Sequence, residues 1–291
     1  MDKLLNIKCF LTLLLLFFLS APLPAKGQEV NELFQSVVYL HGKGIKHQEI
    51  NGTDYEIWLK GKNEAHPHPY DEPCSGTGFF VGKGSHIYLI TAEHLARNLR
   101  LEIKVTVHGP EDKPLTYDIQ ELTGSQQEQP WFFHSEADVA ILLLKPSENF
   151  KGAIKVLESN MLLSDDSSYS QYRDRVLTTI GFPLGLGVRG KFSPITRSSR
   201  VASNWLTYQR FDKKIETTFL FLDDPSVAGF SGAPVYAMSA GQFGRGAFGA
   251  GKCICIGLVH STVLDNTGGK FAAIVPSWFI LQTIEKFENG K

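Results

Sequence analysis

Short apolar runs alternate with turns along most of the chain, which is the pattern of a β-rich protein. Residues 76–81 and 86–91 are strand-like and are separated by Gly82-Lys83-Gly84, so they are predicted to form a hairpin. Residues 101–107 alternate in side-chain character as a half-buried strand does, whereas residues 139–144 form a continuous apolar run that suits a fully buried strand. Further strands are predicted at residues 36–41, 175–180, 201–208, 217–222, 233–237, 253–260 and 271–275.

Three stretches lack a regular pattern. Residues 42–70 are polar around the strand-like residues 55–59, so they are predicted to be an insertion or long loop. Residues 147–174 form a polar connection between two strand-rich halves, and residues 239–252 form a glycine-rich loop. Only the end of the chain has apolar residues at helical spacing, which predicts a helix over about residues 277–288. Many short strands and one terminal helix indicate an all-β fold, built as a sandwich or as barrels.

The first residues have the order of a secretory signal peptide. Lys3 and Lys8 supply positive charge, residues 9–19 are almost wholly apolar, and small residues follow at Ala25 and Gly27. We therefore expect residues 1–27 to be a signal peptide and the mature protein to be periplasmic or extracellular. The alternative is an N-terminal anchor that stays attached, although the apolar run is short for a membrane span.

Composition narrows the possible partners. The chain has 291 residues, of which 43% are hydrophobic and 20% charged, so it can bury a sizeable core. Its formal net charge is −1 and no basic stripe stands out, so nucleic-acid binding is not expected. The sequence also lacks a polybasic run that would hold an anionic bilayer, so no membrane contact is expected after signal cleavage.

The cysteines leave two arrangements open. Cys9 lies in the predicted signal peptide, which leaves Cys74, Cys253 and Cys255. After export a disulfide from Cys74 to either of the other two is chemically possible, but three buried free thiols are at least as consistent with the sequence. Because Cys253-Ile254-Cys255 lacks the usual zinc-knuckle spacing, we expect no metal site and no cofactor.

Three short segments carry candidate chemistry. The strand over residues 86–91 leads to His94, Asp138 precedes a buried strand, and Ser231 is flanked by glycines at the start of another strand. A serine hydroxyl needs an adjacent base to act as a nucleophile near neutral pH, and the histidine base needs a buried acid to orient it. The developing oxyanion needs backbone N–H donors, and we expect these to be the N–H groups of Gly229 and Ser231.

The order of these segments resembles that of chymotrypsin-like serine peptidases, especially the bacterial branch with glutamyl endopeptidases and HtrA-type proteases. Further segments carry the resemblance: Ser75-Gly76-Thr77-Gly78-Phe79, Gly181-Phe182-Pro183 and Gly257-Leu258-Val259-His260-Ser261. The resemblance covers residues 75 to 275 and keeps the order His, Asp, Ser.

This resemblance implies a fold and an activity. The expected fold is two six-stranded antiparallel Greek-key barrels with a C-terminal helix. Residues 28–150 would form the barrel with His94 and Asp138, and residues 151–291 the barrel with Ser231. The implied activity is serine endopeptidase hydrolysis of protein or peptide substrates through an acyl-enzyme on Ser231.

Substrate choice is harder to derive. The resemblance implies that Ser226, His260, Ser261 and Thr262 help to line the substrate pocket. His260 and Ser226 are similar to residues of acid-preferring relatives, but His260 stands one step out of register. A preference for glutamate is therefore only one of the open possibilities.

Two residues depart from the family pattern. Glu93 replaces the small residue that usually precedes the histidine, and it either faces solvent or raises the histidine pKa. Phe230 replaces the aspartate that precedes the serine in trypsin, so a zymogen switch that traps a new N-terminus is not expected.

Three alternatives remain in view. The first is a catalytically inactive module of the same fold used for protein binding. The second is an α/β-hydrolase esterase, which fits poorly because His94 and Asp138 precede Ser231. The third is an HtrA-like chaperone-protease, for which the residues after Ser231 leave no room for a PDZ domain.

Overall fold

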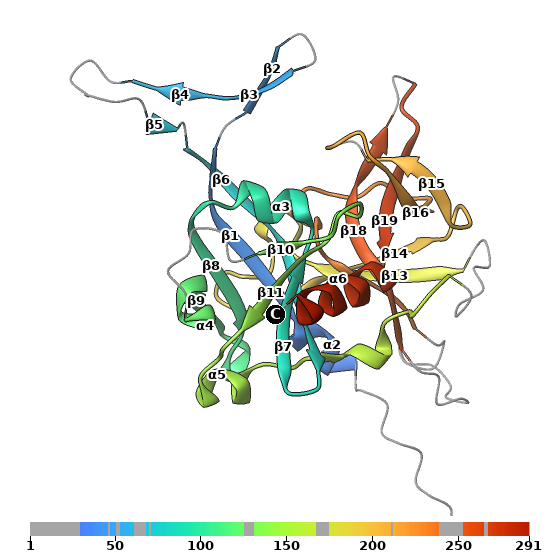
Figure 1. The fold of residues 1–291 in the computed structure, drawn as a ribbon. Coiled ribbons are helices and arrows are strands. Elements are labelled where there is room, and N and C mark those ends of the chain that lie inside the picture. Colours follow the sequence, from blue (N-terminus) through green and yellow to red (C-terminus); the bar gives the residue numbers. More distant parts are fainter. Residues whose placement is uncertain are drawn as a thin grey trace, which may run out of the picture.

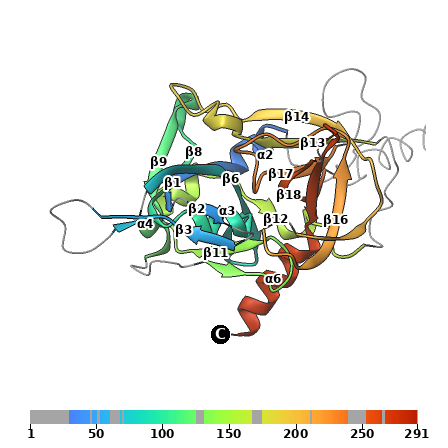
Figure 2. The same cartoon turned by 90° about the horizontal axis from the view of Figure 1, so that it is seen from above.

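A computed structural model of the protein describes residues 30–45, 47–50, 53–60, 68–69, 71–124, 131–166, 175–210, 212–238, 253–264 and 267–290. The expected signal peptide and the glycine-rich loop over residues 239–252 lie outside these ranges. Two strand-rich halves lie side by side (Figures 1 and 2). No helix in the described ranges is long and apolar enough to cross a bilayer.

The first half is a sheet in the order β10-β11-β7-β6-β1-β8-β9, with β12 paired in parallel to β6. The predicted hairpin is present, because β6 pairs with β7 in antiparallel register from Phe79–Ile90 to Lys83–His86. The strands are β1 (Val37–Ile45), β6 (Asp71–Lys83), β7 (His86–Thr91), β8 (Leu101–His108), β9 (Pro114–Asp118), β10 (Phe132–Phe133), β11 (Ala140–Leu144) and β12 (Leu157–Glu158).

The second half is a sheet in the order β14-β13-β17-β18-β19-β16-β15. The predicted all-β double-barrel fold is confirmed. The sheets hold eight and seven strands because the short β10, β12 and β15 are added to six strands in each half. The strands are β13 (Val176–Gly181), β14 (Ile195–Arg200), β15 (Leu206–Gln209), β16 (Glu216–Leu222), β17 (Pro234–Ala237), β18 (Ile254–Leu264) and β19 (Lys270–Pro276).

The sequence pattern misplaces one strand and misses others, including β9, β10, β12 and β14. Residues 201–208 are not one strand, because β15 begins only at Leu206 and Val201 forms an isolated bridge to Leu222. The strand β14 was not expected from its sequence, Ile-Thr-Arg-Ser-Ser-Arg. It is an edge strand whose side chains are mostly exposed, so no apolar alternation marks it.

Several helices accompany the sheets, although only the last was predicted. They are α2 (Val30–Ser36), α3 (Glu93–Asn98), α4 (Ile119–Thr123), α5 (Glu148–Ala153) and α6 (Trp278–Asn289), with 3-10 turns at Pro110–Asp112, Ser159–Met161 and Pro183–Gly185. The short helices have two turns or fewer, too few for a periodic pattern. The helix α6 packs against the first barrel, where Phe287 contacts Tyr88 and Phe132 and Lys83 pairs with Glu288 (Figure 1).

The expected loop over residues 42–70 is partly strand. The strand β1 runs on to Ile45, and β2 (His47–Ile50) pairs with β3 (Thr53–Glu56). The two-residue strands β4 (Trp58–Leu59) and β5 (His68–Pro69) form a second pair. These elements make an arm that projects from the first barrel (Figure 1).

Candidate active site

His94 and Asp138 are brought together by neighbouring strands. His94 is the second residue of α3, which follows β7, and Asp138 precedes β11. Because β11 pairs with β7 through Ala140 and Thr91, the two side chains emerge at the same sheet end. The Nδ1 of His94 lies 2.7 Å from Asp138 Oδ2, and the backbone N–H of His94 donates to Asp138 Oδ1 at 2.9 Å. Asp138 is completely buried, so it holds one orientation of the imidazole.

Ser231 lies in a turn that only glycines can form. Gly229 and Gly232 have φ values of +96° and +81°, which is left-handed backbone that other residues rarely adopt. A Cβ on Gly229 would stand 2.5 Å from the carbonyl oxygen of Phe182. The turn presents a half-buried Ser231 at the start of β17. Its Oγ donates to the carbonyl oxygen of His260 at 3.4 Å, rather than to His94, in the described part of the chain.

Thr77 joins this turn to the first barrel. It lies fully buried in β6, and its hydroxyl donates to the carbonyl oxygen of Gly229 at 2.7 Å while accepting from the N–H of Phe182 at 3.0 Å. The Thr77 N–H donates to the carbonyl oxygen of Ser231 at 3.0 Å, and the hydroxyl of Thr91 donates to the Thr77 carbonyl. Thr77 therefore holds the serine turn through both its hydroxyl and its backbone N–H.

Two backbone donors stand free beside the serine. Among the described residues, the N–H groups of Gly229 and Ser231 donate to no acceptor. The peptide before Gly229 is held in place because the N–H of Leu184 donates to the carbonyl oxygen of Ala228 at 2.8 Å. Since the carbonyl and N–H of one peptide point in opposite directions, this bond directs the Gly229 N–H away from Leu184. Such a pair of donors suits a developing oxyanion.

His260 does not line an open pocket as expected. Its side chain is buried in β18, stacked on Phe219 with ring centroids 5.3 Å apart. Its Nδ1 donates to Asp138 Oδ2 at 2.5 Å, and the same oxygen also accepts a hydrogen bond from His94 Nδ1. The sequence could not place this contact, because it depends on the register of a strand in the second barrel.

The charges of this cluster shift its proton affinities. Burial on its own would lower the pKa of His94, but the negative charge of Asp138 and the hydrogen bond to it raise that pKa above the usual histidine value. Burial would raise the pKa of Asp138, but His94 and His260 hold it well below its usual range. Asp138 is therefore a carboxylate over the neutral pH range.

No protein-family model and no curated protein matches the sequence. Solved structures match in fold. The HtrA-type protease AlgW with a tripeptide has a TM-score of 0.53 and 14% identity over 90% of this chain and 63% of the AlgW chain. AlgW with a decapeptide has a TM-score of 0.51 and 15% identity over 89% and 66%. The chain has a trypsin-like serine protease fold. It spans less than two thirds of the length of these AlgW chains.

Glu93 has a different place in this trypsin-like fold from either expectation. It is completely buried and therefore does not face solvent. Its Oε2 accepts from Arg210 Nη1 at 2.9 Å, and its Oε1 accepts from Arg97 and Lys213. The charge beside His94 is thus neutralised by three cations, two of which come from the second barrel.

One of the four residues expected in the substrate pocket borders a small cavity. Ser226 borders a cavity of about 10 Å³, together with Asp224, Phe230 and Val259. Thr262 lies beside this segment, because its hydroxyl donates to the carbonyl oxygen of Ser226 at 3.0 Å. Ser261 precedes Thr262 in β18 and is half-buried. The small volume leaves room for little more than a water molecule.

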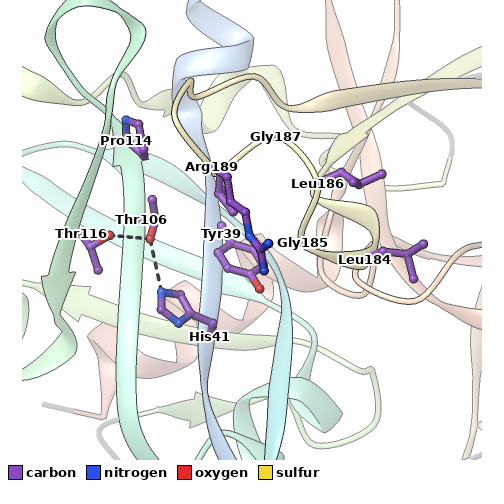
Figure 3. Close-up of a pocket in the computed structure, with 11 residues that line it drawn as sticks. Tyr39, His41, Thr106, Pro114, Thr116, Leu184, Gly185, Leu186, Gly187 and Arg189 are labelled. Atoms are coloured by element: carbon purple, nitrogen blue, oxygen red, sulfur yellow. Dashed lines mark hydrogen bonds between the residues drawn. The ribbon is translucent and has the colours of Figure 1, made fainter.

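A larger pocket is lined by residues 184–189, which adjoin the serine turn through the Leu184 N–H bond to Ala228. It has a volume of about 620 Å³ and runs between β1, β8 and β9 of the first barrel and the segment that begins at Leu184. Figure 3 shows Tyr39 and Arg189 in its centre, with Leu184 and Leu186 on one wall and His41 on the other. The segment that forms one wall therefore also holds the Ala228 carbonyl.

The structure also shows the state of the cysteines and one cluster of possible metal ligands. Cys74, Cys253 and Cys255 are free thiols, so neither of the possible disulfides is formed. Burial raises the pKa of Cys74 to about 11 and that of Cys253 to about 12. His94, Asp138 and His260 bring donor atoms within 4.8 Å of one another, a spacing that could hold a metal ion. The guanidinium of Arg210 at 3.3 Å from Asp138 disfavours an added cation there.

Proposed function

We propose that the protein is a secreted serine endopeptidase in which Ser231 is the nucleophile, His94 the general base and Asp138 the orienting acid. The observation that carries the proposal is the fully buried Asp138, which accepts from both the ring and the backbone N–H of His94. Such a carboxylate fixes the imidazole tautomer with Nδ1 protonated, and so leaves Nε2 free to take a proton.

The proposed reaction has two acyl-transfer steps. Rotation about the Cα–Cβ bond of Ser231 takes its Oγ from the His260 carbonyl towards His94. The Oγ attacks the scissile carbonyl carbon as its proton passes to His94 Nε2, and the free N–H groups of Gly229 and Ser231 stabilise the oxyanion. His94 then protonates the leaving amine, and water hydrolyses the ester by the reverse sequence of proton transfers.

The substrate class is proposed from the fold and the pockets. AlgW has been solved with a tripeptide and with a decapeptide. We infer that this chain also binds an extended peptide, and that the pocket of Tyr39, Leu186 and Arg189 receives a part of it. Location in the periplasm or outside the cell is proposed from the signal-like residues 1–27 alone.

The test compares the wild type with Ser231→Ala. Both are incubated with a fluorophosphonate probe and with a denatured-protein library between about pH 6 and about pH 9, where the histidine base becomes neutral. We expect probe labelling at Ser231 and new peptide termini with the wild type only. A folded wild type that takes no label and cuts nothing would refute the proposal.

One observation leads us to propose a second candidate, a catalytically inactive binding module. Ser231 Oγ bonds to the His260 carbonyl and not to His94. Catalytic hydrogen bonds are often long or misaligned before substrate binds, so this geometry is compatible with both functions. Peptide binding without probe labelling would support the binding module.

A further inference from the structure

The turn between β15 and β16 brings a buried cation to the back of the candidate active site. Arg210 is completely buried although it carries a charge. Its Nε donates to Asp212 at 2.9 Å, its Nη1 donates to Glu93 at 2.9 Å and to the Glu136 carbonyl at 3.0 Å, and its Nη2 contacts Asp138 Oδ1 at 3.3 Å and Asp212 at 2.5 Å. A guanidinium has five N–H donors, and all five have acceptors here.

Each barrel supplies groups that the other requires. Glu93 and Asp138 belong to the first barrel, whereas Arg210, Asp212 and Lys213 belong to the turn of the second. A buried charge without a partner costs several kcal/mol, so neither Glu93 nor Arg210 is stable in this place alone. Arg97 completes the balance on the first barrel by binding Glu93 Oε1. The contact between the barrels therefore depends on this set of charges.

We propose that Arg210 is a positioning residue of the active site, holding Asp138 through Oδ1 so that Oδ2 stays directed at His94. The proposal rests on the proposed function, since it assigns a role beside His94 and Asp138. The second oxygen of Asp138 already accepts from two histidines, so its orientation needs a restraint on Oδ1. The His94 backbone N–H gives one such restraint and Arg210 gives another from the opposite barrel.

The positive charge of Arg210 also acts on His94. The neighbouring charges have opposite effects on the His94 pKa, because Asp138 and Asp212 raise it and Arg210 lowers it. Removal of the Arg210 charge should therefore raise the His94 pKa and move the acid limb of activity to higher pH. The charged and titratable groups that face this cluster are Asp138, His260, Asp212, Glu93, Lys213, Arg97 and His134.

The test uses Arg210→Met, Arg210→Lys and the double variant Arg210→Met with Glu93→Gln. The control is Lys214→Met, which removes an exposed cation of the same turn. Full-chain proteins are compared by thermal unfolding, by the pH profile of kcat and kcat/KM, and by NMR titration of the histidine rings.

We expect Arg210→Met to move the His94 titration and the acid limb upward by about half a pH unit or more, and to lower kcat about tenfold. Arg210→Lys should restore the pH profile but only part of kcat, because lysine keeps the positive charge but lacks the planar set of N–H donors of the guanidinium. The control should match the wild type. In Arg210→Met, Glu93 loses one of its three cations and keeps Arg97 and Lys213. If this variant does not fold, the double variant also removes the Glu93 charge and provides the same measurements.

The outcomes separate this inference from the proposed function. An unlabelled, inactive wild type would refute the peptidase, while the NMR titration of His94 would still report whether Arg210 acts on the His94–Asp138 pair. Wild-type activity together with an unchanged titration and unchanged kcat in a folded Arg210→Met variant would overturn the positioning role.

Discussion

Removal of the Thr77 hydroxyl is a small chemical change that breaks the side-chain contact between the serine turn and the first barrel. The perturbation is Thr77→Val, which keeps the shape of the side chain and removes the hydroxyl. It leaves the Gly229 carbonyl and the Phe182 N–H, both in buried residues, without their side-chain partner. A stranded buried polar group costs about 1–3 kcal/mol, so two should lower the free energy of unfolding by about 2–4 kcal/mol. In a chain of this size that corresponds to a Tm lower by roughly 5–15 °C.

Activity should fall as well, because the Gly229 carbonyl is no longer held. The oxyanion donors then lose their fixed position, and we expect kcat/KM to drop by about 10- to 100-fold. The assay is urea unfolding followed by circular dichroism, together with hydrolysis of a peptide found in the library experiment.

The matched control is Thr77→Ser, which keeps the hydroxyl and loses one buried methyl group, at a cost of about 1 kcal/mol. A second control is Thr283→Val in α6, whose buried hydroxyl bonds only within its own helix to the Phe279 carbonyl. The reasoning would be refuted if Thr77→Val were as stable and as active as Thr77→Ser.

Three further predictions follow from the same contacts. Gly229→Ala should abolish probe labelling of Ser231 and lower stability, because the residue has a φ of +96° and the added Cβ would meet the Phe182 carbonyl. The control Gly84→Ala should be only mildly destabilised, because its φ is +60° and the added Cβ would meet open space. Probe labelling and thermal unfolding compare the two variants. Because the pKa of His94 is raised above 6.5, kcat/KM should fall as the pH drops through a value above 6.5, and an acid limb below that value would contradict the charge balance. Because the cavity beside Ser226 is about 10 Å³, peptides with glycine, alanine or serine before the scissile bond should be cut faster than those with glutamate or aromatic residues, and the termini found by mass spectrometry will show it.

The sequence predicts the parts of the fold in which burial follows the chain. The hairpin of β6 and β7 and the buried strand β11 are marked by apolar runs and by turn glycines, and their ends place His94 and Asp138. The glycines around Ser231 indicate a turn in the sequence, and the structure shows that Gly229 and Gly232 have left-handed backbone. The edge strand β14 has no such mark, because one face is exposed and the other buries the polar Ser199 and not an apolar side chain.

The surroundings of Asp138 could not be predicted for a different reason. Residues 210–214 are mostly charged, and such a run is usually a solvated turn. Only the folded chain shows that Arg210 is buried against a carboxylate of the other barrel. His260 was expected in the substrate pocket for a similar reason, since a strand sequence does not tell which neighbour its side chain meets.

The apparent defect at Glu93 is explained by these same long-range contacts. A carboxylate next to a catalytic histidine would be harmful if it were buried without compensation, because desolvation of a lone charge is costly. Arg210 lies 117 residues away in the sequence and provides part of that compensation at 2.9 Å, together with Arg97 and Lys213. Loss of Arg210 would leave Glu93 with Arg97 and Lys213, and loss of Glu93 would leave Arg210 with Asp138 and Asp212. The effects of the two substitutions on stability should therefore be non-additive, because the two residues share one network of charges. The departure at Glu93 from the pattern of the peptidases that the chain resembles consequently gives no reason to regard the site as damaged, since cations of both barrels neutralise its charge.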